Sequence, residues 1–165
     1  ILLRMIRKTT MNHNKKGFTL VETLIYIALL TLIIGSGVVA SFYVIDSSEK
    51  EKRNINAIAE AAFLMRKIDW ALNGADSVDL SVPGTLSVNK NGFPGNPIVI
   101  NSSSDRAQIT IGNAPPVTSQ LTGDWVKITG LTFLDIPAVP PKPAGVTASF
   151  TADGKPFEMT KYLRK

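Results

Sequence analysis

The chain has 165 residues, enough for one ordinary domain and an appendage, and it has no cysteine, which excludes disulfides and thiolate metal sites. Its formal net charge of +5 comes entirely from residues 1–17, because basic and acidic residues balance from Phe18 onward. A body without a basic patch lacks the footprint of a phosphate-backbone binder, so we expect no direct contact with nucleic acid.

The first predicted element is a basic leader, residues 1–17, which contains five basic residues and no acidic residue. The chain begins with Ile, and Met5 and Met11 are both candidate starts. Basic residues beside an apolar segment tend to stay in the cytoplasm. The leader is therefore predicted to be cytoplasmic and the rest of the chain to be exported.

A membrane-spanning helix is predicted next, within residues 18–45. The 23 residues from Thr23 to Ile45 carry no charge, and a helix of that length covers about 35 Å, enough for a hydrocarbon core of roughly 30 Å. A buried helix of a soluble protein is the less favoured interpretation. Glu22 lies at the entrance of this run, where a carboxylate costs about 2.5–3.5 kcal/mol on insertion scales, so it needs a partner or a task.

Residues 46–73 are predicted to continue the helix as an amphipathic segment, because Asp46 to Leu72 contains neither Pro nor Gly. Arg66 and Asp69 are spaced to pair on it, and Asn73-Gly74 is expected to end it. Seven apolar residues share about half of the helical wheel and form the predicted buried face: Ile55, Ile58, Ala59, Ala62, Phe63, Met65 and Leu72.

Residues 74–165 are predicted to form a β-rich exported domain with an antiparallel sheet, since short alternating runs are broken by Pro, Gly and Asn. The fold class is therefore α+β, a long N-terminal helix packed on a C-terminal antiparallel sheet. A proline-rich connector is expected at 137–143. The predicted strands are 78–82, 85–88, 97–100, 107–111, 125–129, 130–136, 146–151 and 157–163.

No motif indicates catalysis. His13 is the single histidine, and H-E-x-x-H, P-loop and G-x-S-x-G sequences do not occur. Asn101 and Asp105 carry oxygen atoms that suit calcium, but solvated turn residues are the favoured interpretation. We therefore expect no enzyme, no metal and no cofactor.

The stretch Lys15-Lys16-Gly17-Phe18-Thr19-Leu20-Val21-Glu22 resembles the processing site of the type IV pilin family, which includes pilins, minor pilins and pseudopilins of type II secretion. The resemblance implies that a prepilin peptidase cuts between Gly17 and Phe18 and methylates the new amine of Phe18. It also implies that Glu22 pairs with the Phe18 amine of a neighbouring subunit during filament assembly.

The implied partners are the prepilin peptidase and methyltransferase, other pilin or pseudopilin subunits, an inner-membrane assembly platform and membrane lipid. Many major pilins of this family carry a proline in the membrane segment and a C-terminal disulfide loop, and this chain has neither, so a minor pilin or pseudopilin is preferred.

The alternative is a secreted or signal-anchored β-domain binding protein unrelated to pili. Val38-Val39-Ala40 before Ser41 fits a signal-peptidase site with small residues. The mature N-terminus separates the two hypotheses, since Phe18 favours the pilin and Ser41 the secreted protein.

Overall fold

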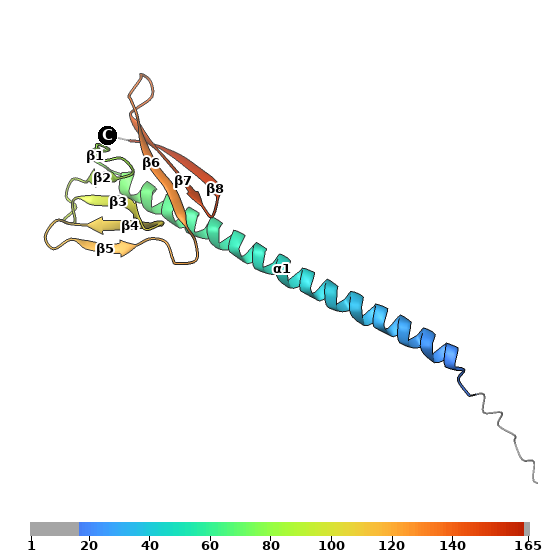
Figure 1. Ribbon diagram of the computed structural model, residues 1–165. Helices are drawn as coiled ribbons and strands as arrows, with labels where there is room; N and C mark the ends of the chain where they lie inside the picture. Colours follow the sequence, from blue (N-terminus) through green and yellow to red (C-terminus); the bar gives the residue numbers. More distant parts are fainter. Residues whose placement is uncertain (1–16, 164–165) are drawn as a thin grey trace, which may run out of the picture. The chain divides into compact units, whose positions relative to one another are not determined.

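The computed structural model describes residues 17–163, which fold into one long helix followed by eight strands (Figure 1). The helix, α1, spans Leu20–Leu72. All strands pair antiparallel, so the predicted α+β fold with a long N-terminal helix is confirmed. The strands are β1 Ser77–Asp79, β2 Leu86–Asn89, β3 Ile98–Ser103, β4 Arg106–Ile111, β5 Val117–Gln120, β6 Ile128–Ile136, β7 Gly145–Ala152 and β8 Lys155–Tyr162.

The chain divides into two compact units, Ile1–Asp46 and Ser47–Lys165, and each is described by itself. The division falls within α1, one residue beyond the predicted end of the membrane helix. The predicted leader lies outside the described residues except for Gly17. The functional boundaries of the leader, the membrane helix and the exported domain stay predictions.

Helix α1 ends at the Asn73-Gly74 signal. Gly74 has φ 71°, in the left-handed region that glycine adopts without steric cost. The N–H of Asn73 donates to the carbonyl of Asp69 at 2.9 Å, and the N–H of Ala75 donates to that of Leu72 at 3.3 Å. These bonds satisfy carbonyls of the last turn and direct the chain into the first strand.

The second unit contains two sheets. Strands β1 to β5 form a meander in sequence order, and β6, β7 and β8 form a second meander. Two hairpins have tight two-residue turns: Ser104-Asp105 joins β3 to β4 and Asp153-Gly154 joins β7 to β8, and all four residues have positive φ. Positive φ at both central residues matches the twist of paired strands.

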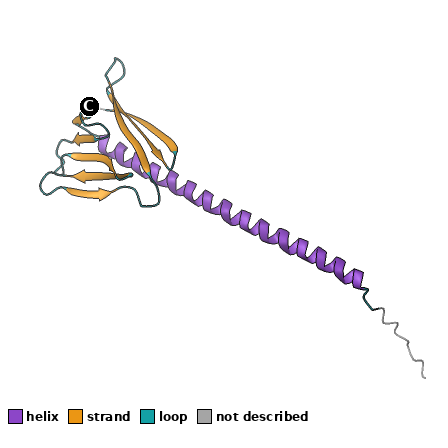
Figure 2. Cartoon of the chain, in the orientation of Figure 1, coloured by secondary structure: helices purple, strands orange, loops and turns teal. Residues whose placement is uncertain are grey.

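Both sheets and the C-terminal part of α1 contribute to one hydrophobic core. Figure 2 shows the strands beside this part of the helix. The helix contributes a row of small and large residues at helical spacing, and each sheet contributes residues from alternating positions of its strands. The core members from the helix are Ala57, Ala61, Leu64, Ile68, Ala71 and Leu72, and those from the strands include Leu86, Val88, Ile98, Ile100, Ile128, Phe133, Val146 and Phe150.

The predicted buried face of the amphipathic segment is wrong. Of its seven residues only Leu72 is buried, Ala62 and Met65 are partly buried, and Ile55 and Ile58 are exposed. The strands instead cover the side of the helix lined by its six core residues, Ala57, Ala61, Leu64, Ile68, Ala71 and Leu72. The predicted face left out Leu64 and Ile68, which are both 0% exposed, and so followed a neighbouring side of the helix.

The predicted pairing of Asp69 with Arg66 is also wrong. Asp69 Oδ1 instead lies 2.7 Å from Lys161 Nζ on β8. The carboxylate therefore links the helix to the second sheet rather than to the next turn of its own helix.

The strand predictions need three corrections. Strand β5 was missed, because its four residues are all exposed and show no apolar alternation. The predicted strands at 125–129 and 130–136 overlap one strand, β6, whose register shifts between Thr129 and Thr132 around Gly130, at φ 64°. This bulge interrupts the apolar alternation from which strands are predicted.

The strands also form two sheets rather than the one that was predicted. The connector at 137–143 does join β6 to β7, with an isolated bridge between Val139 and Lys142.

Candidate processing and assembly site

The predicted processing residues lie just before α1. Gly17 and Phe18 are not helical, and Phe18 is 72% exposed. No other atom lies within 4 Å of a Cβ placed on Gly17. The peptide bond between these residues therefore lies in an exposed stretch outside regular secondary structure.

Thr19 caps the N-terminus of α1. Its hydroxyl oxygen accepts the N–H of Glu22 at 3.3 Å, and its carbonyl accepts the N–H of Thr23 at 3.2 Å. Thr three residues before Glu is the sequence pattern of a capping box, and an acid in the first turn also interacts favourably with the helix dipole. The same residues that resemble the processing motif thus fix where the helix begins.

Three side chains line one side of this helix start, four residues apart. The Tyr26 hydroxyl donates to Glu22 Oε1 over a long 3.4 Å, and the rings of Phe18 and Tyr26 meet edge to face with centroids 6.1 Å apart. Residues spaced by four are neighbours on a helix surface. Tyr26 was not among the residues predicted for this site, although its spacing of four residues from Glu22 was the available signal.

Glu22 is half-buried, and within residues 17–163 no cationic side chain pairs with it. Its backbone N–H donates to the Thr19 hydroxyl oxygen, and its carboxylate accepts a long hydrogen bond from the Tyr26 hydroxyl. A carboxylate that accepts one hydrogen bond from a hydroxyl can still accept further hydrogen bonds from a positively charged group.

The predicted membrane segment, Thr23 to Ile45, lies wholly within α1, and its large apolar side chains are exposed in the described chain. Its hydroxyl groups bond to carbonyls one turn earlier, as in Thr31 to Ala28, Ser36 to Ile33 and Ser41 to Gly37, each at 2.9 Å. Polar groups satisfied within the segment suit a lipid environment. By its length and composition, α1 is long and apolar enough to cross a membrane.

Residues 17–163 contain no group of three or more His, Cys, Asp or Glu side chains arranged to hold a metal ion. Asp105 lies in the turn into β4, as predicted, but the interpretation of Asn101 as a solvated turn residue is wrong. Asn101 lies within β3, where its Oδ1 is buried and has no described hydrogen-bond partner. The start of α1 is therefore the candidate functional site.

The comparisons with known proteins agree on that location. A family model described as the prokaryotic N-terminal methylation motif matches residues 12–38. Neither a curated protein nor a solved structure matches the chain. The match supports a role like that of the type IV pilins and pseudopilins, a structural family, and with the apolar helix it supports membrane anchoring.

Proposed function

We propose that the chain is a minor pilin or pseudopilin subunit, stored in the cytoplasmic membrane as a prepilin. The prepilin peptidase cleaves it after Gly17 and methylates Phe18, and α1 then polymerises with other subunits on an inner-membrane assembly platform. The match to the N-terminal methylation motif at residues 12–38 carries this proposal. The leader faces the cytoplasm and the β-rich domain lies outside, as the basic residues of the leader favour.

The local backbone supports cleavage at Gly17 over cleavage at Ala40. Exposed chain outside regular structure is the preferred substrate of proteases, and the Gly17–Phe18 bond has this character. Ala40 and Ser41 lie inside α1, where the Ser41 hydroxyl also bonds to the carbonyl of Gly37. The alternative, a secreted protein released at Ser41, requires this helical turn to open.

Assembly is proposed to depend on Glu22. Cleavage creates a positive amine on Phe18, four residues before the carboxylate of Glu22. In a filament the amine of one subunit meets Glu22 of a neighbour, and an ion pair in a medium of low dielectric is stronger than in water. The lack of a described cationic partner for Glu22 leaves this carboxylate available.

The Glu22→Ala variant tests assembly separately from insertion and cleavage. In cells with the peptidase and partner subunits, we expect normal membrane insertion and processing but at least about tenfold less protein in sheared filaments, which corresponds to a loss of about 1.4 kcal/mol. Quantitative immunoblotting of membrane and filament fractions measures both.

Glu51→Ala is the matched control, because Glu51 is an exposed acid of the same helix outside the predicted membrane segment. It should enter filaments as the wild type does. Wild-type incorporation of Glu22→Ala would refute the assembly role, and loss of processing in that variant would place Glu22 in peptidase recognition instead.

A further inference from the structure

A basic cavity of about 420 Å³ lies in the Ser47–Lys165 unit, between α1 and the ends of two strands. Arg53 and Asn54 contribute to it from the helix, Lys127 from the chain before β6, and Lys155 from the start of β8. Its lining is Lys50, Arg53, Asn54, Ala57, Asp124, Trp125, Lys127, Asp153 and Lys155.

The two acidic residues of this cavity have partners of their own. Asp124 Oδ1 lies 2.7 Å from Arg106 Nη1, and Asp153 Oδ1 accepts the backbone N–H of Lys127 at 2.9 Å. Lys155 Nζ is held in place by Asn54 Oδ1. Arg53 Nη2 lies 3.9 Å from Glu49 Oε2, a long and exposed ion pair. The lining carries four basic and two acidic side chains, so its formal charge is positive, which suits an anion.

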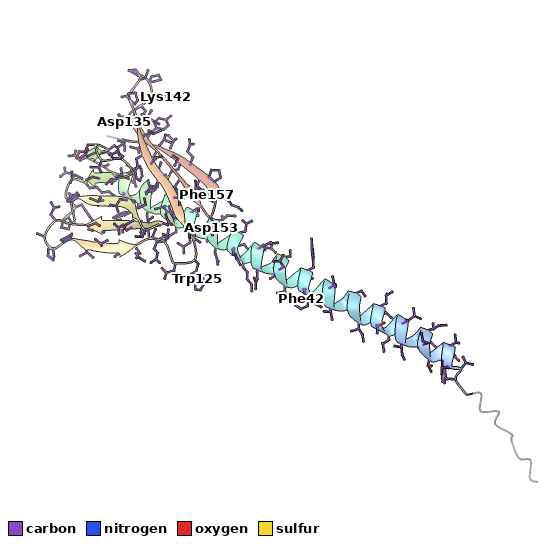
Figure 3. The ribbon with its side chains drawn as sticks, viewed as in Figure 1. Phe42, Trp125, Asp135, Lys142, Asp153 and Phe157 are labelled. Carbon is purple, nitrogen blue, oxygen red and sulfur yellow. The ribbon has the colours of Figure 1, made fainter. Side chains whose placement is uncertain are left out.

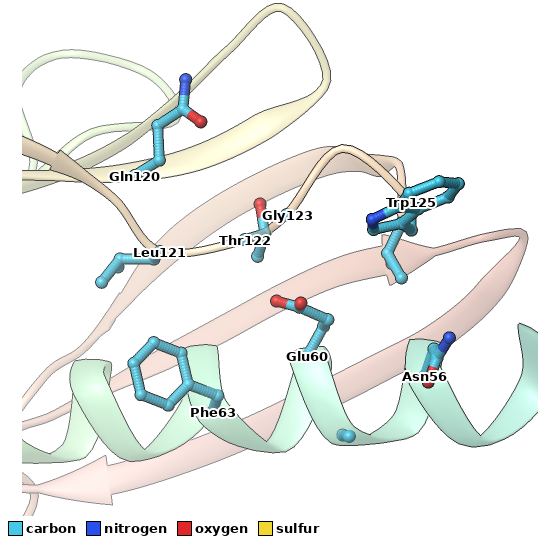
Figure 4. Close-up of a pocket in the computed structure, with 10 residues that line it drawn as sticks. Asn56, Glu60, Phe63, Gln120, Leu121, Thr122, Gly123 and Trp125 are labelled. Carbon is cyan, nitrogen blue, oxygen red and sulfur yellow. The ribbon is translucent and has the colours of Figure 1, made fainter.

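Trp125 stands at the rim of this cavity with 87% of its surface exposed. It also borders a neighbouring groove of about 630 Å³, over Asn56 and Glu60 of the helix (Figure 4). A large ring with a polar N–H is unusual in full contact with water but is typical of the boundary between lipid and water.

The covalent chain limits how far Arg53 can lie from the predicted membrane segment. Arg53 follows Ile45, the last residue of the uncharged run, by only eight residues, which span at most about 29 Å even when fully extended. Such a short tether gives a weak docking surface a high effective concentration at the membrane to which α1 is anchored.

We infer that Trp125, Arg53, Lys127 and Lys155 form a docking surface for anionic phospholipids, called here the lipid-docking surface. The basic side chains bind headgroup phosphates, and the indole inserts at the level of the glycerol backbone. Each basic residue near an anionic membrane strengthens binding through the surface potential. This inference depends on membrane anchoring by α1 and not on cleavage at Gly17 or on filament assembly.

The test uses the full chain in lipid nanodiscs, with Trp70→Phe in all proteins so that Trp125 is the single tryptophan. Discs contain either phosphatidylcholine alone or phosphatidylcholine with phosphatidylglycerol, and a trace lipid carries a spin label at the headgroup. We expect the Trp125 emission to shift to the blue and to be quenched in the anionic discs, and added salt to weaken both effects.

Lys127→Gln should lower the ratio of docked to undocked protein by about fivefold, whereas Lys127→Arg should leave this ratio unchanged. Lys142→Gln is the matched control, because Lys142 lies in the β6–β7 connection at the opposite end of the domain from Trp125 (Figure 3). Co-elution with the discs verifies anchoring, and circular dichroism verifies folding of each variant. Equal quenching in neutral and anionic discs, or equal effects of the Lys127 and Lys142 variants, would overturn the inference.

Discussion

At the scale of single residues, the start of α1 combines a helix cap with the proposed processing site. Thr19 caps the helix by accepting the backbone N–H of Glu22, and the Glu22 side chain presents a carboxylate four residues beyond Phe18. The cap therefore sets the spacing between the future amine and the carboxylate. This arrangement was predictable, because Thr19 and Glu22 have the capping-box spacing and precede an apolar run.

Removal of the cap should loosen the helix start. For Thr19→Ala in the full chain in nanodiscs, we expect a loss of about 0.5–2 kcal/mol of local stability, because the Glu22 N–H loses its acceptor. Hydrogen exchange at the Glu22 amide should be roughly fivefold faster for a cost near 1 kcal/mol.

Thr19→Ser should keep the slow exchange, since serine supplies the same acceptor. Thr31→Ala removes a hydroxyl that bonds within the middle of α1, so it should not affect the Glu22 amide. Unchanged exchange in Thr19→Ala would show that Thr19 does not hold the helix start.

At the scale of elements, α1 has two kinds of surface beyond residue 46. The strands cover the side that contains Ala57 and Leu64, while Ile55, Ile58 and much of Phe63 remain exposed. Sequence reasoning found the extent of the helix but not its buried side. The buried residues Ala57, Ala61, Leu64, Ile68 and Ala71 recur at alternating spacings of four and three, a helical pattern that the prediction did not follow.

A matched pair of alanine variants tests which side is buried. Leu64→Ala should cost about 2–5 kcal/mol, because Leu64 is 0% exposed and its removal leaves a cavity. Ile58→Ala should change the free energy of unfolding by less than about 0.5 kcal/mol, because Ile58 is 49% exposed.

Urea unfolding of the full chain in detergent micelles, followed by tryptophan fluorescence, measures both variants. A larger cost for Ile58→Ala than for Leu64→Ala would restore the face predicted from the sequence and contradict the packing described here.

At the scale of the whole molecule, long continuous patterns were predictable and local interruptions were not. The uncharged run from Thr23 to Ile45 and the Asn73-Gly74 stop gave the bounds of α1 closely. Because of the bulge at Gly130, two strands were predicted where the structure has the single strand β6. Strand β5 was missed because its residues are all exposed and show no apolar alternation. The partition into two sheets depends on tertiary contacts that no local pattern contains.

The same distinction applies to the candidate site. Gly17, Phe18 and Glu22 follow from a compact motif, whereas the contacts of Tyr26 depend on side-chain directions at the helix start. The structure therefore extends the motif by one residue, Tyr26, without changing where the motif lies.

The central claim is that the mature subunit begins at Phe18. Mass spectrometry of the N-terminal peptide, from protein extracted from membranes with an active prepilin peptidase, tests it most directly. The proposal predicts an N-methylated Phe18 terminus. A terminus at Ser41, or an intact Lys15-Lys16-Gly17 sequence joined to Phe18, would contradict it.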